Sequence, residues 1–356
     1  MCKTPIRKPC RMMSKQFSGS EEIMNQSIMG IHDVQKKISE GRSLLLAGEE
    51  AVIQQLPKGN WVGGTIPYFI TKEHGGLASR ELIFVTDITD IVQSVSIAQY
   101  NKDTLANVYV EGPRQGFSFI LIPAASETHL SFAVNAPNYK SFGMSPLIGW
   151  IAGVHLDDLG NKTPKVFNGS TGSMIEDGAI VLRAELKPGK LAEIGIINLF
   201  EQGDGDTLTF SADGFSAKDV MVNGVPHNFA AYLKEHNLDT RLPIVADYYG
   251  ALVNISFQCI NEAENMVHFY APVFSGIRYK HAKPIADYVA AFDAHVSKVM
   301  GSNTDKVVFS CNCILNYLFS NLENKKTGAF VGPVTFGEIA YQLLNQTLVY
   351  LEIKDY

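Results

Sequence analysis

The chain has 356 residues, of which 46% are hydrophobic and 19% are charged, and its formal net charge at pH 7 is −6. This composition excludes a disordered chain, because it supplies enough apolar surface for a buried core, and the length suits two domains of ordinary size. The negative charge and the scattered basic residues disfavour a surface for nucleic acid or for anionic membranes.

The first 20 residues are predicted to form a basic, flexible leader. Its basic residues are Lys3, Arg7, Lys8, Arg11 and Lys15, and it has no acidic residue. A signal peptide requires an apolar stretch, which is missing after these residues, and no segment reaches the ~20 apolar residues that cross a bilayer. We therefore expect a cytoplasmic protein without membrane insertion, whose natural start is Met12 or Met13.

The next segment, residues 21–200, is predicted to mix helices and strands. Residues 21–40 have a serine cap, early acids and apolar residues at helical spacing, which predicts a helix. Phe117, Phe119 and Leu121 fall at alternate positions, so the strand there should bury one face. Residues 126–142 fit either a helix or a loop. Further strands are expected at 43–47, 81–86, 107–110, 146–154 and 179–186, and a short helix at 49–56.

An acidic, glycine-containing turn at residues 201–206 indicates a domain boundary or a hairpin tip. Beyond it, strands and helices mix again. Strands are expected at 207–210, 219–222, 251–258, 267–273, 306–309 and 347–353, and helices at 228–236, 284–300 and 313–322. The fold class predicted from this order is α+β, with two mixed α/β-sheet domains of similar size at residues 21–200 and 201–356.

Several motifs in the second half resemble the C-terminal FIST domain, a bacterial ligand-sensing module. These segments are Met221-Val222-Asn223-Gly224-Val225-Pro226, Val307-Val308-Phe309-Ser310-Cys311, Phe336-Gly337-Glu338-Ile339 and Asn345-Gln346-Thr347-Leu348-Val349. Residues 166–182 are similar to the end of the N-terminal FIST domain, and the glycine-containing turn at 60–65 is similar to its beginning. The chain departs from the family after Cys311, where Asn312-Cys313-Ile314-Leu315 replaces a glycine–arginine stretch.

The resemblance implies an input module for signalling that binds a small molecule, and some FIST relatives bind haem and respond to nitric oxide. The chain carries no kinase, cyclase or receptor output domain, so a sensor of this kind would act through a partner protein. The residues that we predict to bind the ligand are Cys311, Gly337, Glu338, Asn345, Gln346, Thr347, Asn60 and Trp61.

Each of these residues also has a structural interpretation. Glu338 would bind an amine or guanidinium, with Gly337 allowing close approach, or it would cap a backbone amide. The paired donors and acceptors of Asn345 and Gln346 suit either a polar ligand or the fixing of adjacent loops. Trp61 beside its glycines would wall a pocket or simply pack a turn.

The cysteines and histidines give no recognisable metal motif. The five cysteines are an odd number without a disulfide pattern, and Cys311 and Cys313 are too close for half of a zinc knuckle. A buried thiol pair is the simpler interpretation. The nine histidines occur singly, but haem ligation needs only one, so His227 and His268 are weighed as ligands against ordinary structural roles.

The leading hypothesis is a non-enzymatic, cytoplasmic sensor that binds an amino acid or another polar metabolite and reports through a signalling partner, without a metal or other cofactor. The alternatives are a hydrolase or transferase that uses Cys311 or Glu338, a haem-binding nitric oxide sensor, and an interaction protein whose pocket has closed.

Overall fold

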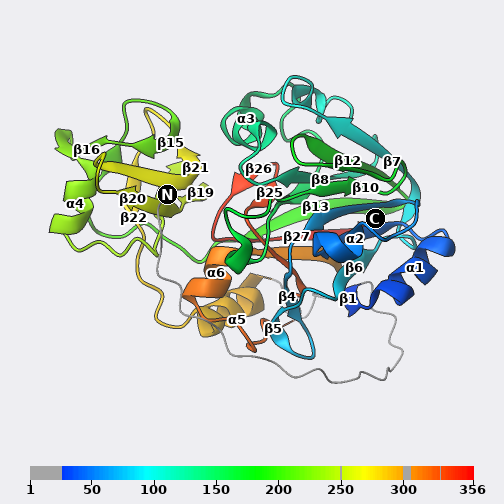
Figure 1. Ribbon diagram of the computed structural model, residues 1–356. Helices are drawn as coiled ribbons and strands as arrows, with labels where there is room; N and C mark the ends of the chain where they lie inside the picture. The colour runs from blue at the N-terminus through cyan, green and yellow to red at the C-terminus, as the bar shows by residue number, and fades with distance from the viewer. Residues whose placement is uncertain (1–25, 249–250, 300–305, 329) are drawn as a thin grey trace.

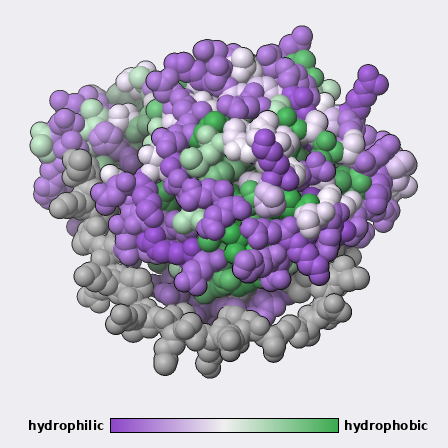
Figure 2. Space-filling model, turned by 45° about the vertical axis from the view of Figure 1, so that its right-hand side comes forward, coloured by the Kyte–Doolittle hydropathy of each residue, from purple (hydrophilic) through white to green (hydrophobic). Residues whose placement is uncertain are grey.

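The computed structural model describes residues 26–248, 251–299, 306–328 and 330–356, so the predicted leader lies outside them. The described chain has a mixed α/β fold in which strands predominate, as Figure 1 shows. Polar residues cover most of the face in Figure 2, with hydrophobic atoms between them in small patches. None of the described helices is long and apolar enough to cross a bilayer.

The first sheet lies near the N-terminal helices. Its strands, in spatial order, are β1 (Gln26–Met29), β6 (Ile83–Asp87), β2 (Leu44–Gly48), β3 (Trp61–Thr65), β10 (Val166–Asn168) and β11 (Ser173–Ile175). Helix α1 (Ile31–Ser39) packs against this sheet through the buried side chains of Val34 and Ile38. Helix α2 (Glu50–Ile53) follows strand β2. The helix predicted over 21–40 therefore begins only at Ile31. Residues 26–29 are extended instead, because they pair antiparallel with β6.

The second sheet combines strands from residues 92–186 with two strands from near the end of the chain. Its order is β26 (Gln342–Leu344), β25 (Glu338–Ala340), β9 (Leu147–Ala152), β8 (Gly116–Pro123), β12 (Ala179–Leu186) and β7 (Val92–Tyr100). Strands β8 and β9 are parallel, and the chain between them forms α3 (Glu127–Asn135), which settles the predicted ambiguity of residues 126–142. Strand β8 is buried on both faces rather than one, because Phe119 and Ile120 contribute to two different hydrophobic clusters.

The third sheet joins strands from the two ends of the chain. Its order is β13 (Lys190–Ile197), β27 (Leu348–Asp355), β23 (Val307–Cys313), β24 (Gly332–Thr335), β4 (Tyr68–Thr71) and β5 (Gly75–Ala78). The last strand, β27, pairs with β13 along its length, and β24 pairs with β4. Helices α5 (Tyr288–Val299) and α6 (Ile314–Phe319) lie below this sheet in the view of Figure 1. These three sheets are called the main body here.

Residues 203–281 form a separate unit, the lobe, at the left of Figure 1. One sheet contains β17 (Val225–Asn228), β16 (Asp219–Val222), β14 (Leu208–Thr209), β22 (Tyr279–His281), β18 (Ile244–Tyr248) and β19 (Ala251–Ile255). A smaller sheet contains β15 (Gly214–Ala217), β21 (Met266–Val273) and β20 (Phe257–Asn261), and α4 (Phe229–Glu235) packs beside them. The lobe begins and ends at one place, because Gln202 and Ala282 form an antiparallel bridge and the Gly203 amide donates to the His281 carbonyl at 2.9 Å.

Most other predicted elements lie within a few residues of their expected positions. One predicted strand is wrong: in place of a strand at 107–110, the chain forms a 3-10 turn at Leu105–Asn107. The acidic turn at 201–206 leads into the lobe.

Candidate functional site

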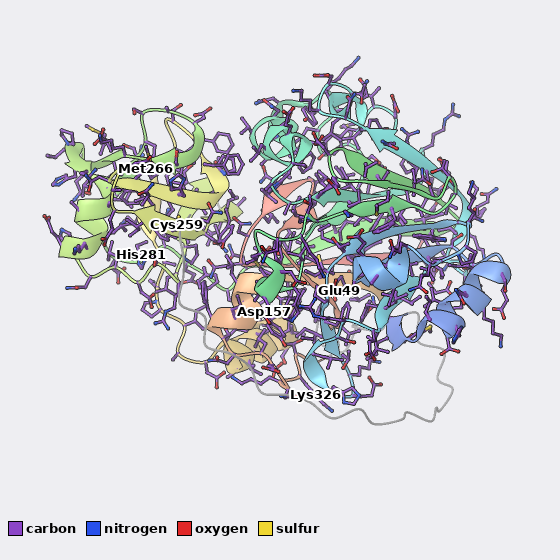
Figure 3. The ribbon with its side chains drawn as sticks, viewed as in Figure 1. Glu49, Asp157, Cys259, Met266, His281 and Lys326 are labelled. Carbon is purple, nitrogen blue, oxygen red and sulfur yellow. The ribbon has the colours of Figure 1, made fainter. Side chains whose placement is uncertain are left out.

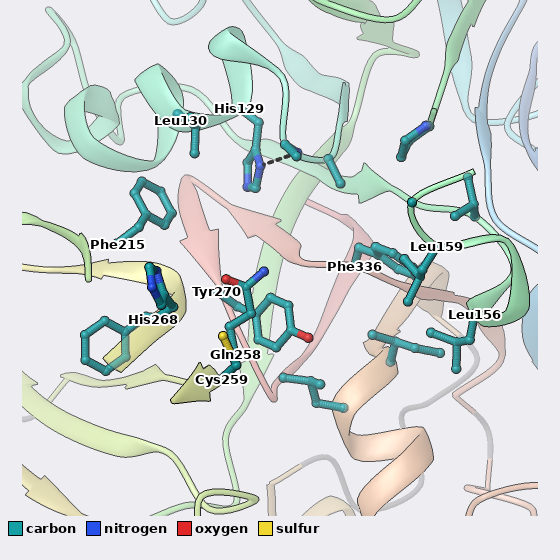
Figure 4. Close-up of a pocket in the computed structure, with 18 of the residues that line it drawn as sticks. His129, Leu130, Leu156, Leu159, Phe215, Gln258, Cys259, His268, Tyr270 and Phe336 are labelled. Atoms are coloured by element: carbon teal, nitrogen blue, oxygen red, sulfur yellow. Dashed lines mark hydrogen bonds between the residues drawn. The ribbon is translucent and has the colours of Figure 1, made fainter. Parts of the chain in front are cut away.

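A cleft of about 770 Å³ is lined by residues of the lobe and of the main body. Figure 3 shows Cys259, Met266 and His281 in the lobe and Glu49 and Asp157 in the main body. The lobe wall consists of the small sheet β15–β21–β20. The opposite wall consists of the turn between β8 and α3, the segment 154–164, helix α6 and Phe336. Figure 4 shows these walls facing each other.

The lobe wall is shaped by two irregularities in strand pairing. The register shifts between Gly214 and Ser216 in β15, and between Phe257 and Cys259 in β20. The extra residue in β20 is Gln258, whereas at the β15 irregularity the extra residues belong to β21. Phe215 and Gln258 both line the cleft. A β-bulge of this kind re-aims a side chain, and bulges are frequent beside active sites. Strands β15 and β20 flank β21, whose His268 and Tyr270 also line the cleft.

His129 is held on the opposite wall by the start of α3. Ser126 is the N-cap, and its hydroxyl oxygen accepts a hydrogen bond from the His129 backbone N–H at 3.0 Å. The preceding Ala125 has a left-handed backbone with φ 61°, which bulky residues rarely adopt. Its backbone N–H donates to the Nδ1 atom of His129 at 3.1 Å. The turn therefore fixes the imidazole ring by a bond to one of its two nitrogens.

That bond also determines which ring nitrogen carries the proton. A backbone N–H can only donate, so Nδ1 is the acceptor and Nε2 is protonated in the neutral ring. The side chain is buried, with only 8% exposed, and Nε2 has no hydrogen-bond acceptor among the described residues. Burial lowers the pKa of His129 to about 4, so the ring is neutral near pH 7. His129 thus presents a neutral N–H donor to the cleft.

The other polar side chains of the lining include Lys162, Gln258, Asn261, Glu264, His268 and Tyr270. Figure 4 shows the His129 ring directed across the cleft towards Gln258 and Tyr270. Burial raises the pKa of the Tyr270 phenol, which therefore keeps its proton. Lys162 already pairs with Asp158 at 3.0 Å and with Glu49 at 3.8 Å. The rest of the lining is largely apolar, as is typical of small-molecule sites.

The predicted ligand residue Glu338 lies beneath this cleft rather than on its surface. It belongs to β25 instead of a turn, and it is fully buried. Its Oε2 atom accepts hydrogen bonds from the backbone N–H of Thr347 at 3.2 Å and from the Thr347 hydroxyl at 2.9 Å. Burial raises the pKa of Glu338 to about 8. The carboxyl group thus caps a backbone amide, as its structural interpretation expects, while the nearby Phe336 lines the cleft.

Gly337 is a point of close packing next to Glu338. Its carbonyl accepts from the Ile151 backbone N–H at 2.8 Å, and an added Cβ would lie 2.9 Å from the Leu343 side chain. A larger residue would therefore press on the sheet that carries Glu338.

Cys311 and Cys313 are both buried in the same core. Burial raises the pKa of both thiols well above the usual value, and Glu338 adds to the shift. The Cys311 thiol donates to the Gly149 carbonyl at 3.7 Å. A buried, protonated thiol is a poor nucleophile, so this geometry does not favour the catalytic role considered for Cys311.

Asn345 and Gln346 lie where the lobe meets the end of β26. The Gln346 amide donates to the Arg241 carbonyl at 3.0 Å and accepts from the Ser256 hydroxyl at 2.7 Å. The Asn254 amide donates to the carbonyl of Asn345 at 3.1 Å. These bonds tie the lobe to the main body, which corresponds to the loop-fixing interpretation.

Asn60 and Trp61 are not brought together with the other predicted residues. Trp61 belongs to the cluster beneath α1, its indole N–H donates to the Pro57 carbonyl at 2.8 Å, and its ring lies against Gly169. Neither residue lines the cleft. The contacts are those of a packed turn.

Residues 29–354 match the model of a family of unknown function, DUF6976. The chain belongs to the DUF6976 family. The match spans both the lobe and the main body, so both walls of the cleft lie within the family's extent. No curated protein matches the chain.

For haem ligation, the sequence of this DUF6976 protein singles out His227 and His268 rather than His129. His129 does not fit that role, because its Nε2 carries the proton and Nδ1 accepts from Ala125. His227 is exposed on β17, away from the cleft lining. Of the two histidines singled out in the sequence, only His268 lines the cleft.

The sequence of this DUF6976 chain did not predict most of the residues that face the cleft. One signal was present: Ser126 followed by Glu127 marks a helix start, and His129 comes three residues after the cap. Gln258 and Tyr270 had no comparable signal, because a β-bulge depends on the partner strand.

Proposed function

We propose that this protein is a small-molecule-binding sensory protein whose ligand occupies the cleft between the lobe and the main body. The buried Nε2–H of His129, which has no acceptor within the described chain, carries the proposal. A buried donor without a partner is costly, and a ligand acceptor in the cleft would remove that cost. The cleft volume of about 770 Å³ lies within the range of small-molecule sites.

The proposal includes a division of the chain into two parts of unequal size. The sequence predicts two similar domains that meet at residue 201. The strand pairs favour an inserted lobe at 203–281, because β24, β25 and β27 pair with β4, β9 and β13. The ligand would then contact both the inserted lobe and the body that surrounds its two ends.

Binding of a ligand in this position would be signalled to a partner protein through the junction of the lobe and the main body. The Asn345 and Gln346 hydrogen bonds join the lobe to the end of β26, and Phe336 lies two residues before β25, which pairs with β26. Binding that bridges both walls would stabilise one arrangement of this junction, which a signalling partner would then recognise. The resemblance to FIST input modules supports this role, as does the expectation of a cytoplasmic protein.

The experiment is a thermal-shift screen of amino acids and small metabolites, combined with native mass spectrometry of the purified protein. A ligand at about one hundred times its dissociation constant should raise the melting temperature by about 3 °C. The same compound should have no effect on Leu130→Trp, because Leu130 lines the cleft and is 43% exposed, so the larger ring fills the cleft without entering the core.

The matched control is Leu191→Trp, since Leu191 has a similar exposure of 47% on β13 and does not line the cleft. This variant should keep the full shift. An unchanged shift in Leu130→Trp would reject the cleft as the site. The absence of any shift at about 1 mM, with no retained small molecule, would reject the function itself.

A further inference from the structure

We propose that the ligand carries an uncharged amide group on an apolar body, and that His129, Gln258 and Tyr270 bind the amide. This inference rests on the proposed function, because it assigns the ligand class of the same cleft. The three side chains come from two different parts of the molecule and line the same cleft, as Figure 4 shows.

His129 requires a hydrogen-bond acceptor on the ligand. Its Nδ1 atom is occupied by the Ala125 backbone N–H, so only the Nε2 proton is available to the cleft. A carbonyl oxygen is a strong acceptor for such a donor, whereas an ammonium group has no lone pair to offer. The fixed ring therefore discriminates between a carbonyl and an amine.

Gln258 and Tyr270 complete the recognition from the lobe. The bulge in β20 re-aims Gln258 into the cleft, where its side-chain amide offers both an acceptor and donors. The Tyr270 hydroxyl is a second donor from the neighbouring strand β21. A ligand amide matches this set, because its carbonyl accepts from His129 and Tyr270 while its N–H donates to the Gln258 oxygen.

The charges around the cleft disfavour an anionic ligand. Lys162, the lysine of the lining, is held by Asp158 and Glu49, and Glu264 accepts a hydrogen bond from Asn261 at 2.9 Å. A carboxylate would lose its hydration without gaining an unpaired cation, because Lys162 already has two carboxylate partners. Glu264 keeps its charge, since Asn261 is neutral, so the discrimination against an ammonium group rests on the His129 donor. An amide has strong hydrogen-bonding groups and no net charge to desolvate.

The remaining lining defines the body of the ligand. Apolar side chains surround the polar groups from both walls, namely Leu130, Phe215, Leu159, Leu315, Leu318 and Phe336. These aliphatic and aromatic surfaces suit a hydrocarbon chain or ring, since burial of apolar area drives its binding. A short alkyl amide is therefore a suitable probe.

The experiment compares octanamide, octanoate and octylamine by isothermal titration calorimetry with the full chain at pH 7. The three probes share one chain and differ only in the polar group. Octanamide should bind about tenfold more tightly than either charged probe. His129→Phe should remove this preference by deleting the Nε2 donor.

Tyr270→Phe provides a second variant that does not depend on the fixed ring. Tyr270 is 37% exposed, so loss of its hydroxyl should leave the fold intact. It should weaken octanamide about fivefold and leave octylamine unchanged. Tyr356→Phe is the control, because Tyr356 is 79% exposed at the C-terminus and does not line the cleft.

Equal affinities for the three probes, or an unchanged octanamide affinity in Tyr270→Phe, would overturn the amide class. If no probe binds but a screened metabolite shifts the wild type and not Leu130→Trp, the class fails while the cleft function stands. If neither the probes nor any metabolite binds, both proposals fail.

Discussion

His129 is a polar side chain in a place where apolar side chains are the rule, and its turn explains how it stays there. The backbone N–H of Ala125 and the Ser126 cap hold the ring and its first helical turn. Because Nδ1 already accepts a hydrogen bond, protonation there would break the bond as well as bury a charge. These two costs keep the imidazole neutral.

The first prediction concerns this protonation state. In ¹⁵N-histidine NMR spectra, His129 should show a protonated Nε2 and an unprotonated Nδ1, and it should stay neutral until the pH approaches about 4. The exposed His227 serves as the internal comparison within the same spectra. A His129 resonance with a proton on Nδ1 would contradict the assigned geometry.

The second prediction concerns Glu338, whose burial acts in the opposite direction. Its pKa is raised from 4.5 in the unfolded chain to about 8, so the folded state binds the extra proton in this window. Glu338 should therefore contribute a fall in the free energy of unfolding as the pH rises, of about 1.4 kcal/mol for each pH unit between about 4.5 and 8. Glu338→Gln should abolish this slope, because an amide does not titrate.

Urea denaturation at a series of pH values measures the slope, and Glu81→Gln at an exposed position is the matched control. Between about pH 4.5 and 6.5 His129 contributes an equal and opposite slope, so the net fall in the wild type should appear between about pH 6.5 and 8. The depressed pKa of His129 makes stability rise with pH from about 4 to 6.5, so the Glu338→Gln variant should reveal that rise. Parallel pH profiles for the wild type and Glu338→Gln would show that Glu338 is ionised in the folded state.

Among single residues, the sequence identified those that secure the fold better than those that face the cleft. Glu338, Thr347 and Cys311, which the sequence predicts as ligand-binding residues, come together in the core, and their hydrogen bonds are internal. The sequence did not predict Gln258 and Tyr270 as cleft residues, because the direction of their side chains depends on a bulge and on strand register. Such features arise from tertiary pairing and leave no local sequence signal.

At the level of elements, the parallel pair β8–β9 carries α3 and therefore places His129. Gly149 on β9 allows the two strands to pair, since an added Cβ would lie 1.8 Å from the Ile120 carbonyl oxygen. Strand β8 is enclosed by β9 and β12, so its backbone has no room to move aside.

The third prediction concerns that contact. Gly149→Ala should lower the free energy of unfolding by about 3 kcal/mol or more, because relief of the clash requires breaking strand pairing. Gly205→Ala is the control, since nothing lies within 4 Å of its added Cβ, and it should change stability by less than about 0.5 kcal/mol. Chemical denaturation measures both. Equal stability of the two variants would show that β8 and β9 separate easily.

The sequence predicted long apolar strands well and short paired strands poorly. Residues 179–186 have enough alternating apolar residues to define β12 as a strand of that length. The three-residue strands β25 and β26 exist because β9 and each other supply hydrogen-bond partners. Residues 26–29 carry an apolar spacing compatible with a helix, and the pairing with β6 makes them a strand.

For the molecule as a whole, the sequence located the turn at residues 201–206 but not the way in which the later strands are arranged. A composition change marks where the lobe begins, whereas the return of β23 to β27 into the earlier sheets has no local signature. Long-range pairing of this kind is decided by the complete set of strands. Two self-contained domains that meet at residue 201 would each fold alone. A lobe inserted into one main body would leave neither half with its strand partners.

The fourth prediction tests the division directly. Residues 26–200 and 201–356, expressed separately, should each fail to give a cooperative thermal transition, because three strand pairs, β4–β24, β9–β25 and β13–β27, join them. Expressed together, the halves should purify as one complex, since those pairs supply the missing edges. Circular dichroism melting and size-exclusion chromatography measure these outcomes, with the intact chain as reference. Two independent cooperative transitions and no complex would instead favour two self-contained domains, because each half would then have to satisfy its own strand edges.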